Sequence, residues 1–281
     1  MHVLNTIHCL KQYRKNLASD KKIAFVPTMG NLHEGHLSLI KQAGLQADCV
    51  IVSIFVNPTQ FLPHEDFDAY PRTIQDDYLR LREAKVDAVF VPNIKDIYPF
   101  KDSQNACVHI KNLENLLCGA SRPGFFSGVC SVLLRLFHLI KPSEVFLGQK
   151  DYQQALIVKQ MCRDFFLDIK VKTCPIVRTK QGLALSSRLN FLSETEKKQA
   201  EFIYKMLSQS QFYFDQGNRN VSGCIQIMRT YLTQNTCIKI DYLDFVDKHT
   251  LKPLLKLSDQ GLFVFAGYLK GVRLIDNFCL S

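Results

Sequence analysis

The sequence lacks an apolar run long enough to cross a bilayer as a helix, which takes about 20 predominantly apolar residues. Its longest uncharged stretch begins at Cys49 and contains the polar or helix-breaking residues Asn57, Pro58, Thr59 and Gln60. The first residues, MHVLNTIHCLKQYRK, hold no basic segment followed by an apolar one, so we expect no secretory signal. These absences predict a soluble, cytoplasmic protein.

The sequence also lacks paired cysteines. Its ten cysteines are scattered singly from Cys9 to Cys279, with no C-x-x-C pair and no two residues at zinc-ligand spacing. In a chain of this length without an export signal, single cysteines are typical of reduced, mostly buried small apolar side chains. Internal repeats and a low-complexity linker are absent as well.

The composition is that of a globular protein with an excess of positive charge. Apolar residues make up 47% and charged residues 22% of the 281 positions, which excludes disordered, collagen-like and coiled-coil chains. Thirty-five Lys and Arg against 26 Asp and Glu give a net charge of +9. That excess favours an anionic ligand, whether nucleic acid, phosphates or small carboxylates. The length fits one large or two ordinary domains.

Short apolar runs alternate with segments of helical spacing in the first part of the chain. The runs cover 23–26, 50–56, 86–91 and 145–147. Continuous apolar strands between helices predict an α/β fold, in which a parallel sheet carries helices on both faces. Ligands of such sheets bind beyond the carboxyl ends of the strands, where the strand order reverses.

The pattern changes near Pro175. Ser193, with Glu196 three residues on, predicts a capping box that begins a helix running to about Gln216, and a second helix follows Ser222. Strand-like segments then cover 238–246, 262–269 and, after a Lys-Gly turn, 273–275. We therefore expect an α/β domain over residues 1–175 and a smaller C-terminal α+β domain over residues 176–281 that closes over the site.

The loop after the first strand, P-T-M-G-N-L-H-E-G-H, predicts a phosphate site, with a helix expected from about His36. His33 and His36 then stand at the positive end of that helix, where backbone N–H groups favour phosphate. Gly30 and Gly35 let a ligand approach the backbone. The imidazoles can donate hydrogen bonds to charge that builds on an α-phosphate as pyrophosphate leaves. Taken alone, H-x-x-H is more often two loop histidines or half a metal site.

Four later loops carry polar groups suited to similar ligands. The amide of Gln60 both donates and accepts, which suits a hydroxyl beside a carboxylate, although N-P-T-Q alone is equally a turn. Lys150 beside Asp151 suits a triphosphate with Mg²⁺, although a surface ion pair is individually commoner. The segment L-S-S-R, ending at Arg188, can close over phosphates as a hinge loop or simply begin a helix. Arg72 in Y-P-R-T can bind an anion or cap a helix.

Together these segments resemble the pantothenate synthetase (pantoate–β-alanine ligase) family of HIGH-type nucleotidyltransferases. PTMGNLHEGHLSLI, VSIFVNPTQF, YPRT, SRPG, GQKDYQQ, LALSSR and RLIDN match in order, from about Lys22 to Asn277. The resemblance implies a Rossmann-like fold and a two-step reaction of pantothenate and coenzyme A biosynthesis. The carboxylate of (R)-pantoate attacks the α-phosphate of ATP, giving pantoyl adenylate and pyrophosphate. The amine of β-alanine then displaces AMP. A cytoplasmic homodimer that uses Mg²⁺, with no nucleic-acid or membrane partner, is also implied.

The resemblance also implies roles for individual residues. The catalytic residues would be His33, His36 as proton donor, Lys150 and Arg188. Gln60 and Gln154 would bind pantoate, Gln60 would also lie near β-alanine, and Asp151 would face Mg²⁺ through ATP. ATP would contact Met29, Gly30, Asn31, Leu32, His33, Glu34, Gly35, His36, Gly148, Gln149, Lys150, Asp151, Val177, Leu185, Ser186, Ser187 and Arg188.

The chain departs from the family pattern at three positions. Phe125 stands where the family usually has His after R-P-G, and Gln149 replaces the Glu of G-E-K-D. Leu189 follows Arg188 where S-S-R-N is usual, with Asn190 one place later. We expect these changes to affect the rate and the local loop geometry more than the reaction itself.

Other functions fit parts of the sequence. An RNA-linked nucleotidyltransferase fits the charge and the H-E-G-H segment, but the chain has no anticodon-type domain, no RNA-recognition aromatic motif and no long basic tract. A degenerate, non-catalytic relative is disfavoured by the intact polar set. A ligase for a related hydroxy acid stays open, because Gln60 and Gln154 alone do not fix the methyl groups of the acid.

Overall fold

The computed structural model describes residues 1–63, 65–100 and 104–280, and the chain divides into two compact units. Unit 1 comprises Met1–Asn115, Arg122–Gln149 and Gln154–Pro175. Unit 2 comprises Leu116–Ser121, Lys150–Gln153 and Ile176–Ser281. Two short segments from the first 175 residues thus pack with the C-terminal part of the chain.

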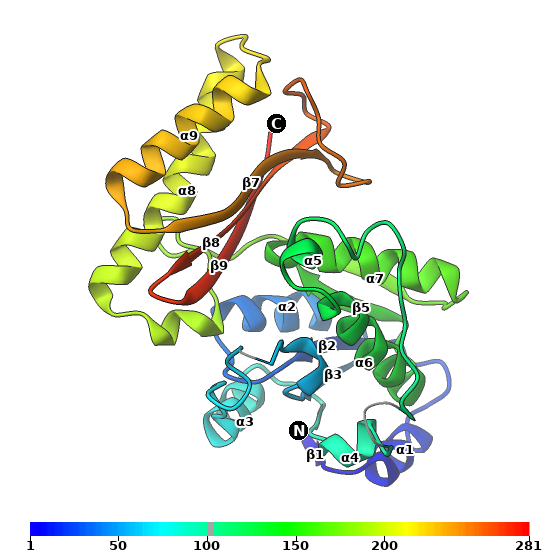
Figure 1. Cartoon of the computed structure of the whole chain (residues 1–281). Helices are drawn as coiled ribbons and strands as arrows, with labels where there is room; N and C mark the ends of the chain where they lie inside the picture. The colour runs from blue at the N-terminus through cyan, green and yellow to red at the C-terminus, as the bar shows by residue number, and fades with distance from the viewer. Residues whose placement is uncertain (64, 101–103, 281) are drawn as a thin grey trace. The chain divides into compact units, whose positions relative to one another are not determined.

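Unit 1 is built on a six-stranded parallel sheet (Figure 1) with the order β1-β4-β3-β2-β5-β6. Its strands are β1 (His2–Leu4), β2 (Ile23–Thr28), β3 (Cys49–Ile54), β4 (Ala88–Phe90), β5 (Glu144–Gly148) and β6 (Lys170–Cys174). The four apolar runs found in the sequence are β2 to β5, so the predicted fold class is confirmed. The outer strands were not predicted, because β1 has three residues and β6 alternates lysines with apolar residues at a sheet edge.

Helices cover both faces of this sheet. Leu39 and Ile40 of α2 belong to one apolar cluster with Val26 of β2, whereas the preceding strand residue, Phe25, packs edge-on against Phe137 of α6. Neighbouring residues of a strand point to opposite faces, so α2 and α6 lie on opposite sides. The helices before Pro175 are α1 (Ile7–Lys15), α2 (Glu34–Gly44), α3 (Ile74–Glu83), α4 (Ile94–Ile97), α5 (Cys118–Ser121), α6 (Phe125–Ile140) and α7 (Tyr152–Asp164). Helix α5 and the first two residues of α7 belong to unit 2.

Helix starts are where the sequence-based prediction was least accurate. The helix expected from about His36 begins at Glu34, because His33 already caps it. Helix α6 begins at Phe125, directly after Gly124, whose φ of 83° stops helical backbone on its N-terminal side. The helix expected after Ser222 begins one residue earlier, capped by Asn220.

The strand order of unit 1 reverses between β2 and β5. The chain runs from β2 outward through β3 to β4, then returns to place β5 on the other side of β2, with Ala24 opposite Glu144 and Phe25 opposite Val145. The carboxyl ends of these two strands lead into the histidine loop and into Gly148. The predicted phosphate loop therefore lies at the position where parallel α/β sheets bind ligands.

Unit 2 contains a three-stranded antiparallel sheet with the order β7-β8-β9. Figure 1 shows the helices α8 (Glu194–Asp215) and α9 (Val221–Asn235) side by side along this sheet. The strands are β7 (Lys239–Asp247), β8 (Gly261–Leu269) and β9 (Val272–Cys279). The capping box expected at Ser193 and Glu196 is present, with each side chain accepting from the backbone N–H of the other residue.

All ten cysteines are thiols, and six of them are buried, as the sequence pattern predicted for most of them. Among the described residues, no helix is both long and apolar enough to span a membrane. Within the same ranges, no group of three His, Cys, Asp or Glu side chains is arranged to hold a metal ion.

Candidate active site

The loop between β2 and α2 has a left-handed bend. Gly30 has a φ of 81° and Asn31 a φ of 50°. Thr28, the last residue of β2, holds the start of the bend: its Oγ1 donates to the Ser53 carbonyl at 2.7 Å and accepts from the Gly30 N–H at 3.2 Å. The bend turns the chain from the buried strand into the first turn of α2.

His33 and His36 lie together at the N-terminus of α2. The Nδ1 of His33 accepts from the Gly35 N–H at 3.1 Å, and the Nδ1 of His36 accepts from the His33 N–H at 3.3 Å. The ring centroids are 4.1 Å apart. A nitrogen that accepts a hydrogen bond carries no proton, so each neutral ring holds its proton on Nε2. In each neutral ring Nε2 is therefore the nitrogen that can donate a hydrogen bond.

Gln60 lies in the 3₁₀ turn η1 (Pro58–Gln60) after β3, and the buried amide of Asn57 orients its side chain. Asn57 Nδ2 donates to Gln60 Oε1 at 3.0 Å, while Asn57 Oδ1 accepts from the Tyr98 hydroxyl at 2.9 Å. Burial raises the pKa of Tyr98, which keeps that hydroxyl protonated as a donor. Because Oε1 of Gln60 faces Asn57, its Nε2 is the group that can donate to a ligand carboxylate or hydroxyl.

Arg122, from the S-R-P-G segment, holds the backbone of Gln60. Its guanidinium is buried and pairs with the Glu65 carboxylate at 2.5 and 2.6 Å, while Nη2 also donates to the Gln60 carbonyl at 3.0 Å. The guanidinium carbon lies 3.8 Å from the centroid of the Phe125 ring. Arg122 is therefore a neutralised structural group of unit 1, and Phe125 covers one of its faces.

Lys150 and Asp151 form the partly exposed ion pair that was the alternative interpretation of G-Q-K-D. Their Nζ and Oδ1 atoms are 3.7 Å apart, with 20% of the Lys150 side chain exposed and 45% of that of Asp151. The backbone here is held by β9, since Asn277 Nδ2 donates to the Lys150 carbonyl at 3.1 Å. Both side chains are partly exposed, which is compatible with the roles predicted for Lys150 and Asp151 beside ATP.

Residues 177–185 form a short loop with antiparallel pairing. The Leu185 N–H donates to the Val177 carbonyl at 3.0 Å, and Arg178 pairs with Ala184. Arg178 also makes a bidentate ion pair with the buried carboxylate of Asp276, at 2.6 and 2.8 Å. Burial raises the pKa of Asp276, and the Arg178 guanidinium opposes that rise. The pair fixes the loop to β9.

The L-S-S-R segment leads into the 3₁₀ helix η4 (Ser187–Phe191). Ser186 caps this helix, its Oγ accepting from the Arg188 N–H at 3.3 Å. The alternative interpretation of the segment as a helix start is therefore correct for its backbone. Leu189, one of the departures from the family pattern, is buried in the apolar core of unit 2.

The two consecutive glutamines at the start of α7 have different surroundings. Gln153 is buried, donates to the Leu116 carbonyl at 2.8 Å and accepts from the Cys118 N–H at 3.2 Å. Gln154 is half-buried, which is compatible with the predicted ligand role.

Arg72, in the Y-P-R-T segment, does not cap a helix. Its guanidinium donates to three carbonyls of its own loop, those of Phe67, Asp68 and Tyr70.

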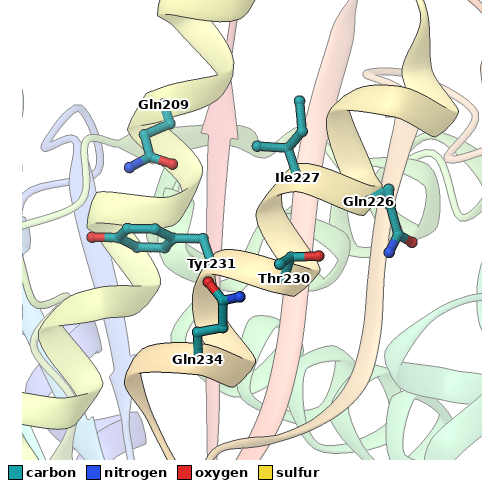
Figure 2. Close-up of a pocket in the computed structure, with 6 residues that line it drawn as sticks. All are labelled: Gln209, Gln226, Ile227, Thr230, Tyr231 and Gln234. Carbon is teal, nitrogen blue, oxygen red and sulfur yellow. The ribbon is translucent and has the colours of Figure 1, made fainter.

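The predicted site residues fall into two groups by unit. Unit 1 holds Met29, Gly30, Asn31, Leu32, His33, Glu34, Gly35, His36, Gln60, Gly148, Gln149 and Gln154. Unit 2 holds Lys150, Asp151, Val177, Leu185, Ser186, Ser187 and Arg188. Neighbouring strands bring the histidine loop and Gly148 together in unit 1, and β9 anchors Lys150 and the 177–185 loop in unit 2. A groove of about 350 Å³ on α8 and α9, lined by Gln209, Ile227 and Tyr231 among others (Figure 2), contains no predicted site residue.

Residues that orient the site were missed by the sequence analysis. Asn57 and Arg122 stood inside the motifs N-P-T-Q and S-R-P-G, so their motif membership was the available signal. Tyr98 and Asp77 lie outside any motif that was singled out, and only the folded chain brings them to the loops that they hold.

A parallel sheet with a histidine-bearing helix N-terminus at its strand-order reversal is typical of α/β enzymes that bind nucleotides. The family model described as Pantoate-beta-alanine ligase matches residues 2–279. The chain is 43% identical, over the full length of both chains, to the pantothenate synthetases of Caldicellulosiruptor saccharolyticus and Thermosipho melanesiensis. This chain belongs to the pantoate–β-alanine ligase family, which confirms the family and the enzyme class predicted from the sequence.

Solved structures agree with this assignment. The pantothenate synthetase of Thermus thermophilus is 38% identical, with a TM-score of 0.93 and 99% of each chain covered. The pantoate–β-alanine ligase of Francisella tularensis, complexed with β-γ ATP and β-alanine, is 39% identical. Its TM-score is 0.84, with 99% of this chain and 97% of that chain covered. The predicted fold, a parallel sheet with a smaller α+β part, is thus shared with members of the family.

Proposed function

We propose that this chain condenses (R)-pantoate with β-alanine to give pantothenate, using ATP and releasing AMP and pyrophosphate. The observation that carries the proposal is full-length membership of the pantoate–β-alanine ligase family, with the histidine loop intact at the strand-order reversal. A carboxylate is a poor electrophile, and its conversion to an acyl adenylate supplies a leaving group for the attack by the amine. The product serves coenzyme A biosynthesis.

In the first step, the pantoate carboxylate attacks the α-phosphate of ATP. Negative charge builds on the phosphate oxygens as pyrophosphate leaves, and the Nε2–H groups of His33 and His36 are the donors that stabilise it. The N-terminus of α2 adds its backbone N–H groups and positive dipole end. Lys150 and Arg188 neutralise the departing pyrophosphate. This assignment rests on the hydrogen bonds that hold both Nδ1 atoms as acceptors.

In the second step, the amine of β-alanine attacks the carbonyl of pantoyl adenylate and AMP leaves. Gln60 binds pantoate through its Nε2–H₂, because its Oε1 is taken by Asn57. Gln154 is the second amide proposed for pantoate. A hydrolysable acyl adenylate has to be kept from water, so closure of the smaller domain over the site accords with the two-step reaction.

We propose that Mg²⁺ accompanies ATP. Asp151 is a partly exposed carboxylate beside a lysine, and a site with one carboxylate and phosphate oxygens suits an ion that keeps several of its waters. When bound, the ion neutralises charge on the triphosphate.

We further propose a homodimer without a nucleic-acid partner. Light scattering on the purified protein tests the dimer, and RNA binding that falls steeply with salt would contradict the second part of this proposal.

The exchange of labelled pyrophosphate into ATP tests the order of steps. We expect exchange when pantoate and Mg²⁺ are present and β-alanine is absent, because the acid is adenylated before the amine reacts. Related hydroxy acids without the methyl groups of pantoate serve as matched controls for the acid. Exchange that ignores pantoate, or that requires β-alanine, would exclude this order.

A further inference from the structure

A single buried carboxylate on α3 holds the backbone of the histidine loop. Asp77 is 1% exposed, its Oδ1 accepts from the Leu32 N–H at 2.8 Å, and its Oδ2 accepts from the Asn31 N–H at 3.0 Å. The hydroxyl of Thr73, one helical turn earlier, donates to Oδ2 at 3.3 Å. The two loop donors are consecutive, so the carboxylate binds them as a fork.

The absence of a side chain at Gly30 gives this carboxylate room beside the loop. A Cβ added at Gly30 would lie 3.1 Å from Asp77 Oδ2 and 3.1 Å from the Ile54 side chain. Gly30 and Asn31 both adopt left-handed backbone, which residues with a Cβ rarely adopt. The carboxylate of Asp77 accepts from the N–H groups of Asn31 and Leu32, and these two hydrogen bonds favour the left-handed bend over other backbone conformations.

The bend determines where the two imidazoles lie. Leu32 directly precedes His33, whose Nδ1 caps α2 and whose N–H is the donor to His36 Nδ1. A displacement of the backbone at residues 31–32 therefore changes the position of His33 at the N-cap of α2. It also changes the two hydrogen bonds to Nδ1 that place the proton of each ring on Nε2. Asp77 acts on the rings through the backbone, since it accepts from the N–H groups of Asn31 and Leu32.

We propose that Asp77 is a positioning residue for adenylation, which holds the 30–33 bend so that His33 and His36 both present Nε2–H to the α-phosphate. The proposal rests on the proposed function for its kinetic consequence, but its structural consequence, the tautomer of the two rings, is independent of activity. Asp76, the neighbouring carboxylate in the first turn of the same helix, is exposed and serves as the matched control.

The test compares Asp77→Asn with Asp76→Asn. Each change removes one negative charge from the first turn of α3, but only the first directs an amide NH₂ at backbone N–H groups, leaving one of them without an acceptor. We expect Asp77→Asn to lower the rate of pantoate-dependent pyrophosphate exchange at least about tenfold, while the KM for β-alanine stays within about twofold. Asp76→Asn is expected to match the wild type in both.

Nitrogen-15 spectra of the imidazoles measure the tautomer of each histidine ring. A residue that only stabilised the fold would not change this tautomer. Wild type and Asp76→Asn are expected to show Nε2–H tautomers for both His33 and His36, and Asp77→Asn a mixture. Thr73→Val is the milder second variant in case Asp77→Asn does not fold: Thr73 makes no side-chain cap to α3, so the change removes only the hydroxyl bond to Asp77. It should shift both readouts in the same direction by less.

The outcomes separate the two proposals. Equal exchange rates and equal tautomers in all variants would overturn the role of Asp77. A wild type without pantoate-dependent exchange would instead overturn the proposed function, and the tautomer spectra would still decide the positioning role. A mixed tautomer in Asp77→Asn with an unchanged exchange rate would show that the histidine geometry is held by Asp77 but does not limit adenylation, which also contradicts the proposal.

Discussion

The guanidinium of Arg122 lies over the ring of Phe125, with 3.8 Å between its central carbon and the ring centroid. The same guanidinium pairs with Glu65 and donates to the carbonyl of Gln60. An aromatic face attracts a cation, so Phe125 stabilises Arg122 where it holds the turn that bears Gln60. Phe125 thus has a supporting contact at the position where the family usually has histidine.

Replacing Phe125 with histidine should therefore change kcat/KM by less than about tenfold, or about 1.4 kcal/mol of transition-state stabilisation. An imidazole can still cover the guanidinium, and the position is only partly buried, so its nitrogens keep access to water. Steady-state kinetics measure the effect, with the melting temperature as control. A hundredfold gain would show that the position is catalytic and that this chain is a weakened member of its family.

His36→Ala should lower kcat for adenylation by about 10²-fold or more, because the lost Nε2–H acts mainly on charge that develops in the transition state. The fold should survive, since the change removes one cap acceptor at the start of α2. Single-turnover formation of pantoyl adenylate measures the rate of this step. Lys150→Ala and Arg188→Ala should also lower the rate of adenylation, and the KM for ATP rises in these variants if the two side chains also bind ATP in its ground state. Near wild-type adenylation by the His36 variant would remove this residue from the mechanism.

Gln60 offers a matched pair of variants. Gln60→Ala should raise the KM for pantoate, because a ligand oxygen loses its donor. Gln60→Glu keeps the oxygen that faces Asn57 but replaces Nε2–H₂ with a second acceptor, so it should impair pantoate binding more than Ala does. The KM for ATP is the internal reference. Pantoate kinetics that are unchanged in both variants would exclude Gln60 from the acid site.

Thiol chemistry tests the predicted burial of the cysteines. Burial raises the pKa of Cys130 to about 12 and that of Cys162 to about 11, so both are protonated and unreactive near neutral pH. A maleimide should label Cys9, Cys107 and Cys237, which are exposed, in the native protein. Peptide mapping by mass spectrometry identifies the labelled sites before and after denaturation. Prompt labelling of Cys130 in the native state would contradict the described core.

Gly128 and Gly44 should differ in how their replacement by alanine changes the free energy of unfolding. A Cβ at Gly128 would lie 2.0 Å from the Thr59 carbonyl oxygen, where α6 meets the Gln60 turn, so Gly128→Ala should destabilise by about 1–3 kcal/mol or more. At Gly44, the last residue of α2, the nearest atom is 4.0 Å away, and alanine should be neutral or stabilising by about 0.5–1 kcal/mol. Urea denaturation compares the two, and equal stabilities would show that α6 can move away from the turn.

Elements defined by local pattern were predictable from the sequence, whereas those defined by distant contacts were not. The apolar runs at β2 and β3 and the Ser193 capping box carry their signals within a few residues. The adjacent carboxylates Asp76 and Asp77 are alike in sequence. Only the face that α3 turns to the sheet makes one a solvent-exposed charge and the other the anchor of the histidine loop.

Two consecutive residues of the last strand, Asp276 and Asn277, hold segments that come much earlier in the chain: Arg178 before the L-S-S-R segment, and the carbonyl of Lys150. Translation delivers β9 after both of those segments have left the ribosome. A nascent chain therefore has Lys150 and the 177–185 loop without these anchors until β9 has been synthesised and has paired with β8. The fixed geometry of these two segments is thus acquired late, and truncation within β9 would leave them without their anchors.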